Sequence, residues 1–291
     1  MAAQHKIIVI LGQTATGKTK LAISLAKKYG GEIICADSRT IYKGMDVGTA
    51  KPTLAEMQGI KHHLIDVVEP NESFSVVDFK TLCQKYLDSI LKKGKLPIIV
   101  GGSGLYLDAV LFDYNFRSSQ GIDTGSMTDA EIVKSAKKLY GEDLGGVDSK
   151  NIRRVAQLLE RGPSNSSDRS SLKLHCKIIG LMLEKPVLKK NIEIRTEQML
   201  DNGFVQEVEK LRKIYGRDCP ALNTTGYHEV SDFLDGRLKP EELGPAIVAA
   251  TLKLAKKQAT WFKRNHHIEW ASDHSHAEAL AESYLKDSLV Q

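Results

Sequence analysis

One short stretch near the start of the chain constrains its fold more than any other. Residues 12–19 read Gly-Gln-Thr-Ala-Thr-Gly-Lys-Thr, after an apolar run at residues 7–11 and before a helix-like segment at residues 20–29. This is the pattern G-x-x-x-x-G-K-[ST] between a strand and a helix. Its glycines let successive backbone N–H groups point at a phosphate, and the helix presents its positive N-terminal end. The stretch predicts binding of a compound with two or more phosphates.

Within this predicted phosphate-binding loop (P-loop), two side chains have distinct roles. Lys18 can reach a terminal phosphate, and the Thr19 hydroxyl can bind a phosphate-bound Mg²⁺. The alternative is a chance glycine turn before a helix, which the intact motif and its flanks disfavour. The predicted diphosphate-binding residues are Gly12, Gln13, Thr14, Ala15, Thr16, Gly17, Lys18 and Thr19, with Thr19 as the metal ligand.

The segments that follow alternate between strand-like and helix-like patterns. Strands are predicted at residues 32–36, 63–68 and 97–100, with a helix at residues 76–93. Short, continuously apolar strands between helices indicate a parallel sheet covered on both faces. Polar clusters at residues 37–39 and 101–104 each follow a strand, as the P-loop does. We expect all three to meet in one crevice at the carboxyl ends of the strands.

The predicted fold class is α/β: a P-loop NTPase-like parallel sheet with helices on both faces, a small, shortened insert and a helical C-terminal part. The predicted boundaries are residues 1–111 for the first part of the core, 112–148 for the insert or lid, and 149–291 for the rest of the core. An ordinary solvated connection is the alternative for the insert. Helices are expected at residues 128–140, 151–161, 187–215, 246–265 and 276–286, and a short strand at residues 174–183.

Composition limits the class of protein. The chain is 42% hydrophobic and 26% charged, and it has no apolar run of 18 residues, which is typical of a soluble protein without a membrane-spanning helix. The first strand begins too early to leave room for a signal peptide, and the four cysteines show no zinc spacing. We therefore expect a cytoplasmic protein. A net charge of +5 permits a nucleic-acid partner without requiring one.

Two strand-end clusters could carry chemistry. Asp37 could act as a general base, bind a metal or hydrogen-bond loop amides, and its position alone does not choose among these. The cluster at residues 101–104 offers backbone N–H groups and the Ser103 hydroxyl, which is weak evidence except beside a P-loop. His266 and His267 have no third ligand at a suitable spacing, so they are interpreted as surface histidines.

Several motifs together resemble the tRNA dimethylallyltransferase family, also called tRNA isopentenyltransferases or IPP transferases. The resemblance covers nearly the whole chain outside the insert. An Asp-Ser-Arg block with a Gly-Thr-Ala-Lys-Pro tail is not a general P-loop feature. The matching stretches are the P-loop and residues 37–39, 41–52, 62–66, 74–79, 97–106, 226–230 and 255–262.

The resemblance implies an activity and its partners. The family transfers a dimethylallyl group from dimethylallyl diphosphate to N6 of the adenosine immediately 3′ of the anticodon in tRNA, releasing diphosphate with the help of Mg²⁺. It implies that Asp37 accepts the amine proton, that Ser103 stands for a family threonine near the reacting centre, and that Arg195 contacts diphosphate. It also implies a monomer. The residues that it places on tRNA are Asp37, Ser38, Arg39, Thr40, Arg153, Arg154 and Lys257.

The chain departs from the family pattern at several RNA-facing positions. Thr40 stands where the family usually has glutamine, and Lys257 and Asn191 stand where arginine is frequent. Asn151 and Gln157 replace an acidic residue and an arginine. These changes, with the shortened insert, question individual RNA contacts, whereas the catalytic set is intact.

Other functions remain open at this point. An adenylate isopentenyltransferase would prenylate a free nucleotide, but the basic stretch around Lys256 and Lys257 and the segment around Tyr227 favour RNA. A P-loop nucleotide kinase would need an arginine-rich lid, and the insert carries a single arginine. A non-catalytic RNA-binding relative is disfavoured by the retained Lys18, Thr19 and Asp37.

Overall fold

The computed structural model describes residues 6–114, 122, 124–144, 147–161 and 171–286. The chain divides into two compact units. The first, which we call the core unit, consists of Met1–Leu111 and Leu172–Gln291, and the second, the inserted unit, is Phe112–Ser171.

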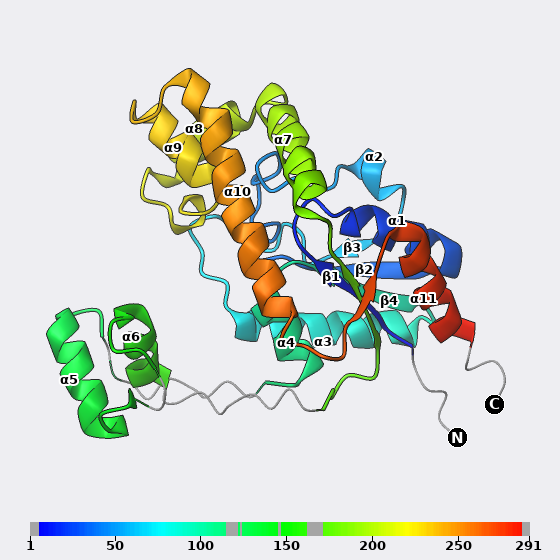
Figure 1. The fold of residues 1–291 in the computed structure, drawn as a ribbon, viewed down its shortest axis with the longest axis horizontal. Helices are drawn as coiled ribbons and strands as arrows, with labels where there is room; N and C mark the ends of the chain where they lie inside the picture. Colours follow the sequence, from blue (N-terminus) through cyan, green and yellow to red (C-terminus); the bar gives the residue numbers. More distant parts are fainter. Residues whose placement is uncertain (1–5, 115–121, 123, 145–146, 162–170, 287–291) are drawn as a thin grey trace. The chain divides into compact units, whose positions relative to one another are not determined.

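A parallel sheet of short strands forms the centre of the core unit (Figure 1), and the strands in the middle of the sheet are buried along nearly their whole length. Its strand order is β3-β2-β4-β1-β5-β6, and every pairing is parallel. The strands are β1 (Ile8–Gly12), β2 (Gly31–Ala36), β3 (His62–His63), β4 (Leu96–Gly101), β5 (Lys177–Leu181) and β6 (Glu269–Ala271).

Helices cover both faces of this sheet, which confirms the predicted fold class. Helices α1 (Lys18–Tyr29) and α11 (His274–Lys286) pack on each other and share one apolar core with β1, β2, β4 and β5. On the opposite face lie α3 (Val76–Lys92) and α4 (Gly104–Leu111), and α3 contacts β2 and β4 (Figure 1). A capping box between Ser75 and Asp78 fixes the start of α3.

The C-terminal part of the core unit is helical, as predicted, and has an apolar core of its own. Phe204, Tyr227 and Leu243 are buried there beside Met45, which belongs to the loop after β2. The elements outside the sheet layers are α2 (Leu54–Met57), α7 (Lys185–Asp201), α8 (Phe204–Tyr215), the short helix Pro220–Leu222, α9 (Tyr227–Leu234) and α10 (Pro240–Phe262).

The inserted unit contains two helices, α5 (Asp129–Tyr140) and α6 (Ile152–Arg161), which pack on each other. Its buried residues include Ile132, Ala136, Val155 and Leu159. The sequence interpretation ended the insert at residue 148 and assigned residues 149–161 to the core. In the structure, α6 contributes half of the small apolar core of the inserted unit.

Two predicted elements differ from the structure. The strand expected at residues 63–68 stops at His63, because Leu64 and Asp66 have φ angles of 62° and 54° and the next amides bond to the Ile41 carbonyl. The helix expected at residues 187–215 is two helices, because Gly203 (φ 88°) ends α7 and begins α8.

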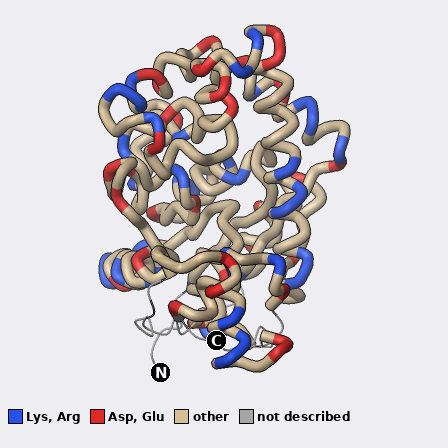
Figure 2. Tube along the Cα trace, turned by 90° about the vertical axis from the view of Figure 1, so that its left-hand side faces the viewer, with Lys and Arg blue, Asp and Glu red and all other residues tan. Residues whose placement is uncertain are grey.

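Over the described residues, the distribution of charged and apolar side chains does not by itself identify a binding partner. Positive and negative residues are interspersed along the chain trace (Figure 2), so the net charge of +5 does not by itself mark a nucleic-acid surface. None of the helices that the structure describes is both long enough and apolar enough to cross a membrane.

The carboxyl end of β1 requires glycine. A Cβ at Gly12 (φ 143°) would lie 2.0 Å from the Leu181 carbonyl oxygen, whereas at Gly30 (φ 65°) nothing lies within 4 Å. We expect Gly12→Ala to lower the free energy of unfolding by about 3 kcal/mol, the sum of backbone strain and a collision with β5. Gly30→Ala is the matched control for backbone strain alone and should cost about 1 kcal/mol. Urea unfolding followed by circular dichroism measures both, and equal losses would contradict the collision.

Candidate active site

The P-loop lies between the end of β1 and the start of α1, as predicted. Gly17 has a φ of 83°, and α1 begins at Lys18 without a side-chain cap and without an acidic residue in its first turn. The N-terminal amides of α1 are therefore suited to an anion. Inside the loop, the Thr16 hydroxyl donates to the Gln13 carbonyl at 2.9 Å, and the Lys18 ammonium donates to the same oxygen.

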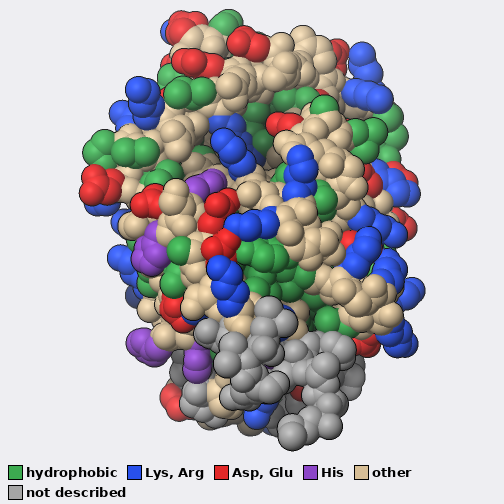
Figure 3. Space-filling view, turned by 90° about the vertical axis from the view of Figure 1, so that its right-hand side faces the viewer, with side chains coloured by type: hydrophobic (Ala, Val, Ile, Leu, Met, Phe, Trp, Pro, Cys, Tyr) green, Lys and Arg blue, Asp and Glu red, His purple; other side chains and the backbone are tan. Residues whose placement is uncertain are grey.

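A cavity of about 1350 Å³ opens at this loop. Figure 3 shows this side of the molecule, where Lys and Arg side chains lie around a hollow in the surface. We call it the P-loop cavity. Its lining comes from the loop and α1, from α7, and from the ends of β2 and β4, including Thr14, Thr16, Lys18, Thr19, Asp37, Thr40, Gly101, Asn191, Arg195 and His274.

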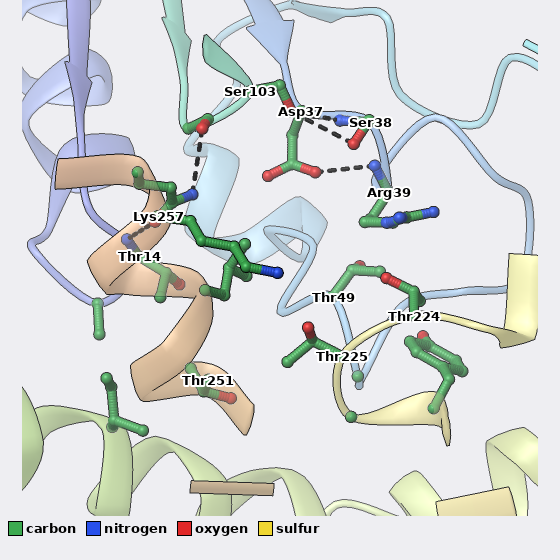
Figure 4. A pocket seen from close by; sticks show the side chains of 18 of the residues that line it. Thr14, Asp37, Ser38, Arg39, Thr49, Ser103, Thr224, Thr225, Thr251 and Lys257 are labelled. Carbon is green, nitrogen blue, oxygen red and sulfur yellow. Dashed lines mark hydrogen bonds between the residues drawn. The ribbon is translucent and has the colours of Figure 1, made fainter. Parts of the chain in front are cut away.

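A second cavity of about 590 Å³ lies beside the first, within the size range of small-molecule sites. We call it the acceptor-side cavity. Figure 4 shows Asp37, Thr14 and Lys257 on one side of it and Thr224 and Thr225 on the other. The two cavities share seven lining residues and therefore meet. These are Thr14, Ala15, Asp37, Thr49, Gly102, Arg195 and Gln258.

Asp37 stands at this junction because it is the first residue after β2. One of its carboxylate oxygens, Oδ1, accepts the Arg39 N–H at 2.8 Å, which closes a tight turn. The Ser103 hydroxyl accepts the Ser38 N–H at 2.9 Å and lies 3.3 Å from the Ser38 hydroxyl (Figure 4). Ser103 therefore holds the turn that carries Asp37, and its hydroxyl does not point freely toward a substrate.

Two cations face the same junction. Burial and the nearby Arg195 lower the pKa of Lys18 to about 7, although the charge of Asp37 acts in the opposite direction. Burial also lowers the pKa of Arg195, opposed by Asp37. Arg195 donates to the Thr14 hydroxyl at 3.2 Å and to the Thr49 carbonyl at 3.3 Å. The site thus contains positive groups that an anionic ligand would stabilise.

The RNA-facing residues named from the sequence are distributed over three places. Ser38, Arg39 and Lys257 line the acceptor-side cavity, and the exposed Lys257 side chain extends into it (Figure 4). Thr40 is buried and lines the P-loop cavity instead, so it is not placed like the other three. Arg153 and Arg154 are exposed on α6 of the inserted unit.

Gln258 is a site residue that sequence reasoning did not identify. Its side chain accepts the Thr14 N–H at 2.8 Å and donates to the Gly102 carbonyl at 3.1 Å, so one amide joins the P-loop to the turn after β4. Only its place in a family motif could have drawn attention to it. Trp261 donates to Asp108 at 2.8 Å and also lines the acceptor-side cavity.

The P-loop lies at the carboxyl edge of a parallel sheet, and Asp37 lies at the same edge, at the end of β2. These features define the class of protein: an α/β protein with a phosphate-binding loop. The sequence profile of the family described as IPP transferase matches residues 40–265. This chain belongs to the IPP transferase family.

Individual relatives agree with this assignment. The tRNA dimethylallyltransferase of Geobacillus thermodenitrificans is 40% identical over 284 residues, which cover 91% of this chain and 90% of the relative. The crystal structure of the tRNA isopentenylpyrophosphate transferase from Bacillus halodurans matches with a TM-score of 0.76 at 33% identity, covering 98% and 97% of the two chains. A eukaryotic dimethylallyltransferase acting on tRNA matches with a TM-score of 0.75 at 26% identity, over 97% of this chain and 78% of that one.

The lowered pKa of Lys18 predicts proton uptake when diphosphate binds. At pH 8 the free ammonium, with a pKa of about 7, is mostly deprotonated, and a bound anion should return its pKa toward the usual range, so close to one proton is taken up. The affinity for inorganic diphosphate should then fall about tenfold per pH unit above pH 7.

Calorimetry in buffers with different ionisation enthalpies measures this uptake. Lys18→Arg is the control, since arginine stays protonated and keeps the charge. Equal proton uptake in both proteins would show that Lys18 already carries its proton before the anion arrives.

Proposed function

We propose that this chain transfers a dimethylallyl group from dimethylallyl diphosphate to N6 of the adenosine immediately 3′ of the anticodon in tRNA. The products are N6-isopentenyladenosine and diphosphate. The observation that carries the proposal is the junction of two cavities at Asp37, one built on the P-loop and the other beside exposed and polar side chains. Membership of the IPP transferase family supports the same reaction.

The donor's diphosphate belongs in the P-loop cavity. The loop amides and the N-terminus of α1 bind its oxygens, and Lys18 and Arg195 stabilise the charge that develops as the C–O bond breaks. In a phosphoryl-transfer enzyme the same loop holds the group that is passed on. Here the diphosphate is the leaving group, and the carbon chain lies toward Asp37.

The residues at the loop fit Mg²⁺ bound mainly through the substrate. Thr19 is exposed at the start of α1 and lines the P-loop cavity, and Asp37 lies in the same cavity. Among the described residues there is no cluster of three or more His, Cys, Asp or Glu that could hold a metal alone. Mg²⁺ commonly binds through one or two protein groups plus phosphate oxygens and water. When bound, it would neutralise charge on the departing diphosphate.

The acceptor adenine belongs in the acceptor-side cavity. An exocyclic amine is a weak nucleophile that becomes acidic as its nitrogen bonds to carbon, so a carboxylate at the junction can accept its proton. Two observations support this role for Asp37: it lines both cavities, and its second oxygen, Oδ2, is not used in the turn. The N6–C bond forms, the C–O bond to diphosphate breaks, and the proton passes to Asp37. The base must leave the stack of the anticodon loop to reach this point.

The RNA around the adenosine requires contacts that a free nucleotide does not. Arg39 and Lys257 at the acceptor-side cavity, and Arg153 and Arg154 on the inserted unit, are suited to backbone phosphates. We propose that these residues contact tRNA and that the enzyme works as a monomer. Light scattering of the purified protein tests the second point, and a dimer would exclude it.

A direct comparison of acceptors tests the function. The purified protein is incubated with dimethylallyl diphosphate and either unmodified tRNA or AMP, and separately with ATP and AMP. Mass spectrometry should find isopentenyladenosine in tRNA only. Product on AMP would indicate the nucleotide prenyltransferase, and phosphorylated product without prenylation would indicate a kinase.

Replacing Asp37 tests the proton acceptor. We expect Asp37→Ala and Asp37→Asn to lower kcat by roughly 10²- to 10⁴-fold, the range for loss of a general base, with tRNA affinity largely kept. The asparagine variant retains an oxygen for the Arg39 N–H, so it separates proton transfer from the turn. Asp88→Asn, on the exposed face of α3, is the matched control. Turnover of Asp37→Asn close to that of the wild type would rule out the base.

Salt dependence tests the arginines of the inserted unit. If each binds one phosphate, the double variant Arg153→Gln/Arg154→Gln should reduce the slope of log K against log salt for tRNA binding by roughly 1 to 2. Filter binding over a range of salt concentrations measures the slope. Arg237→Gln, whose side chain is paired with Asp232, should leave it unchanged. An unchanged slope in the double variant would place these arginines outside the RNA interface.

A further inference from the structure

The loop after β2 is held by a single carboxylate that lies outside both cavities. Glu207, in the first turn of α8, accepts three successive backbone N–H groups: those of Asp46 at 2.9 Å, Val47 at 2.7 Å and Gly48 at 3.1 Å. It also accepts the buried Tyr227 hydroxyl at 2.6 Å. Three consecutive amides converging on one anion form a nest, a strong arrangement for a negative charge. We call this set of hydrogen bonds the Glu207 clamp.

Packing leaves the clamped loop little room to move. A Cβ at Gly48 would lie 2.0 Å from the Phe204 ring and 2.7 Å from the Tyr227 ring, so the loop backbone rests directly on this aromatic pair. The two rings meet edge to face, with centroids 5.0 Å apart. On the other side, the nearly buried Lys51 ammonium bonds to Asp46 and Asp66, each at 2.6 Å.

The clamp ends at the reaction centre. The residue after the three clamped amides is Thr49, which lines both cavities. Its carbonyl accepts a hydrogen bond from the Arg195 guanidinium at 3.3 Å. The other end of the same guanidinium bonds to Thr14 in the P-loop. The position of Arg195 therefore depends on how rigidly the loop holds the Thr49 carbonyl.

From this geometry we propose that Glu207 is a positioning residue for the transfer reaction, acting through the 46–49 loop to hold Arg195 against the P-loop. The inference rests on the proposed function. Glu207 lies on α8, far in sequence from the P-loop. The proposal includes it among the residues that position the leaving group. Glu207 acts through the loop and does not itself contact a substrate.

Glu207→Gln is the sharp test, because it keeps the shape and replaces one accepting oxygen with an N–H₂ donor. At least one of the three loop amides must then face a donor. We expect kcat for prenyl transfer to tRNA to fall about ten- to a hundredfold, the range for losing hydrogen bonds to a charged acceptor. Glu209→Gln, two residues along α8 and paired with Lys213 at the surface, is the matched control and should keep full activity.

A double-mutant cycle separates positioning from general support of the fold. In an Arg195→Lys background the guanidinium is absent, so Glu207→Gln should lower kcat by less than threefold. The same ten- to hundredfold loss in both backgrounds would mean that Glu207 does not act through Arg195, and would overturn the proposal.

Two measurements do not depend on the transfer reaction. Hydrogen exchange at the amides of residues 46–48 should be faster in Glu207→Gln than in the wild type, and affinity for inorganic diphosphate should fall. If the wild type transfers no prenyl group, the proposed function fails while these measurements still judge the clamp. If amide exchange and diphosphate affinity are both unchanged in Glu207→Gln, the positioning role of Glu207 is rejected. Should Glu207→Gln not fold, Glu207→Asp, which withdraws the acceptor by one methylene, should show the same changes.

Discussion

The backbones of neighbouring strands come so close at the carboxyl edge of the sheet that only glycine fits where β1 and β4 end. A Cβ at Gly12 would meet the Leu181 carbonyl oxygen at 2.0 Å, and a Cβ at Gly101 would meet the Ala36 carbonyl oxygen at the same distance. This contact brings the P-loop, the Asp37 turn and the turn after β4 to one edge. Gln258 then joins two of them with its single amide. The distance from the P-loop to Asp37 is thus set by strand pairing, the stiffest part of the fold.

Charge at this edge is arranged for a ligand and not for the free protein. Lys18 and Arg195 are two partly buried basic groups whose pKa values are both lowered by desolvation, and the charge of Asp37 acts in the opposite direction on both. A diphosphate bound here, as proposed, would supply the missing negative charge, so donor binding would stabilise the site as a whole. The same anion would draw Lys18 away from the Gln13 carbonyl, to which it bonds within the loop. Donor binding would therefore complete the electrostatics that the departing diphosphate needs.

The sheet and the P-loop were predictable from the sequence because their signals are local. Apolar runs, the glycine-lysine motif and polar strand ends need no tertiary information, and β1, β2, β4 and α1 lie where they were predicted within two residues. Signals that depend on tertiary contacts failed. The strand predicted at residues 63–68 was wrong beyond His63, because the amides of Val67 and Val68 bond to the Ile41 carbonyl. Helix α4 was missed because it is buried on nearly all sides and shows no helical periodicity. The partner of α6, which places it in the inserted unit, was equally invisible.

The acceptor-side cavity could not have been read from the sequence for the same reason. Its wall combines the turn after β2, the 46–49 loop, α7, the start of α9 and the last turns of α10, segments spread over more than half of the chain. Some residues that determine the shape of this cavity would not themselves contact a substrate. Ser103 is bonded to Ser38, and Glu207 is bonded to loop amides, so both hold backbone in place. A reaction that needs two substrates aligned on one carboxylate depends as much on such supports as on the carboxylate. Motifs identify the carboxylate, whereas only three-dimensional contacts identify its supports.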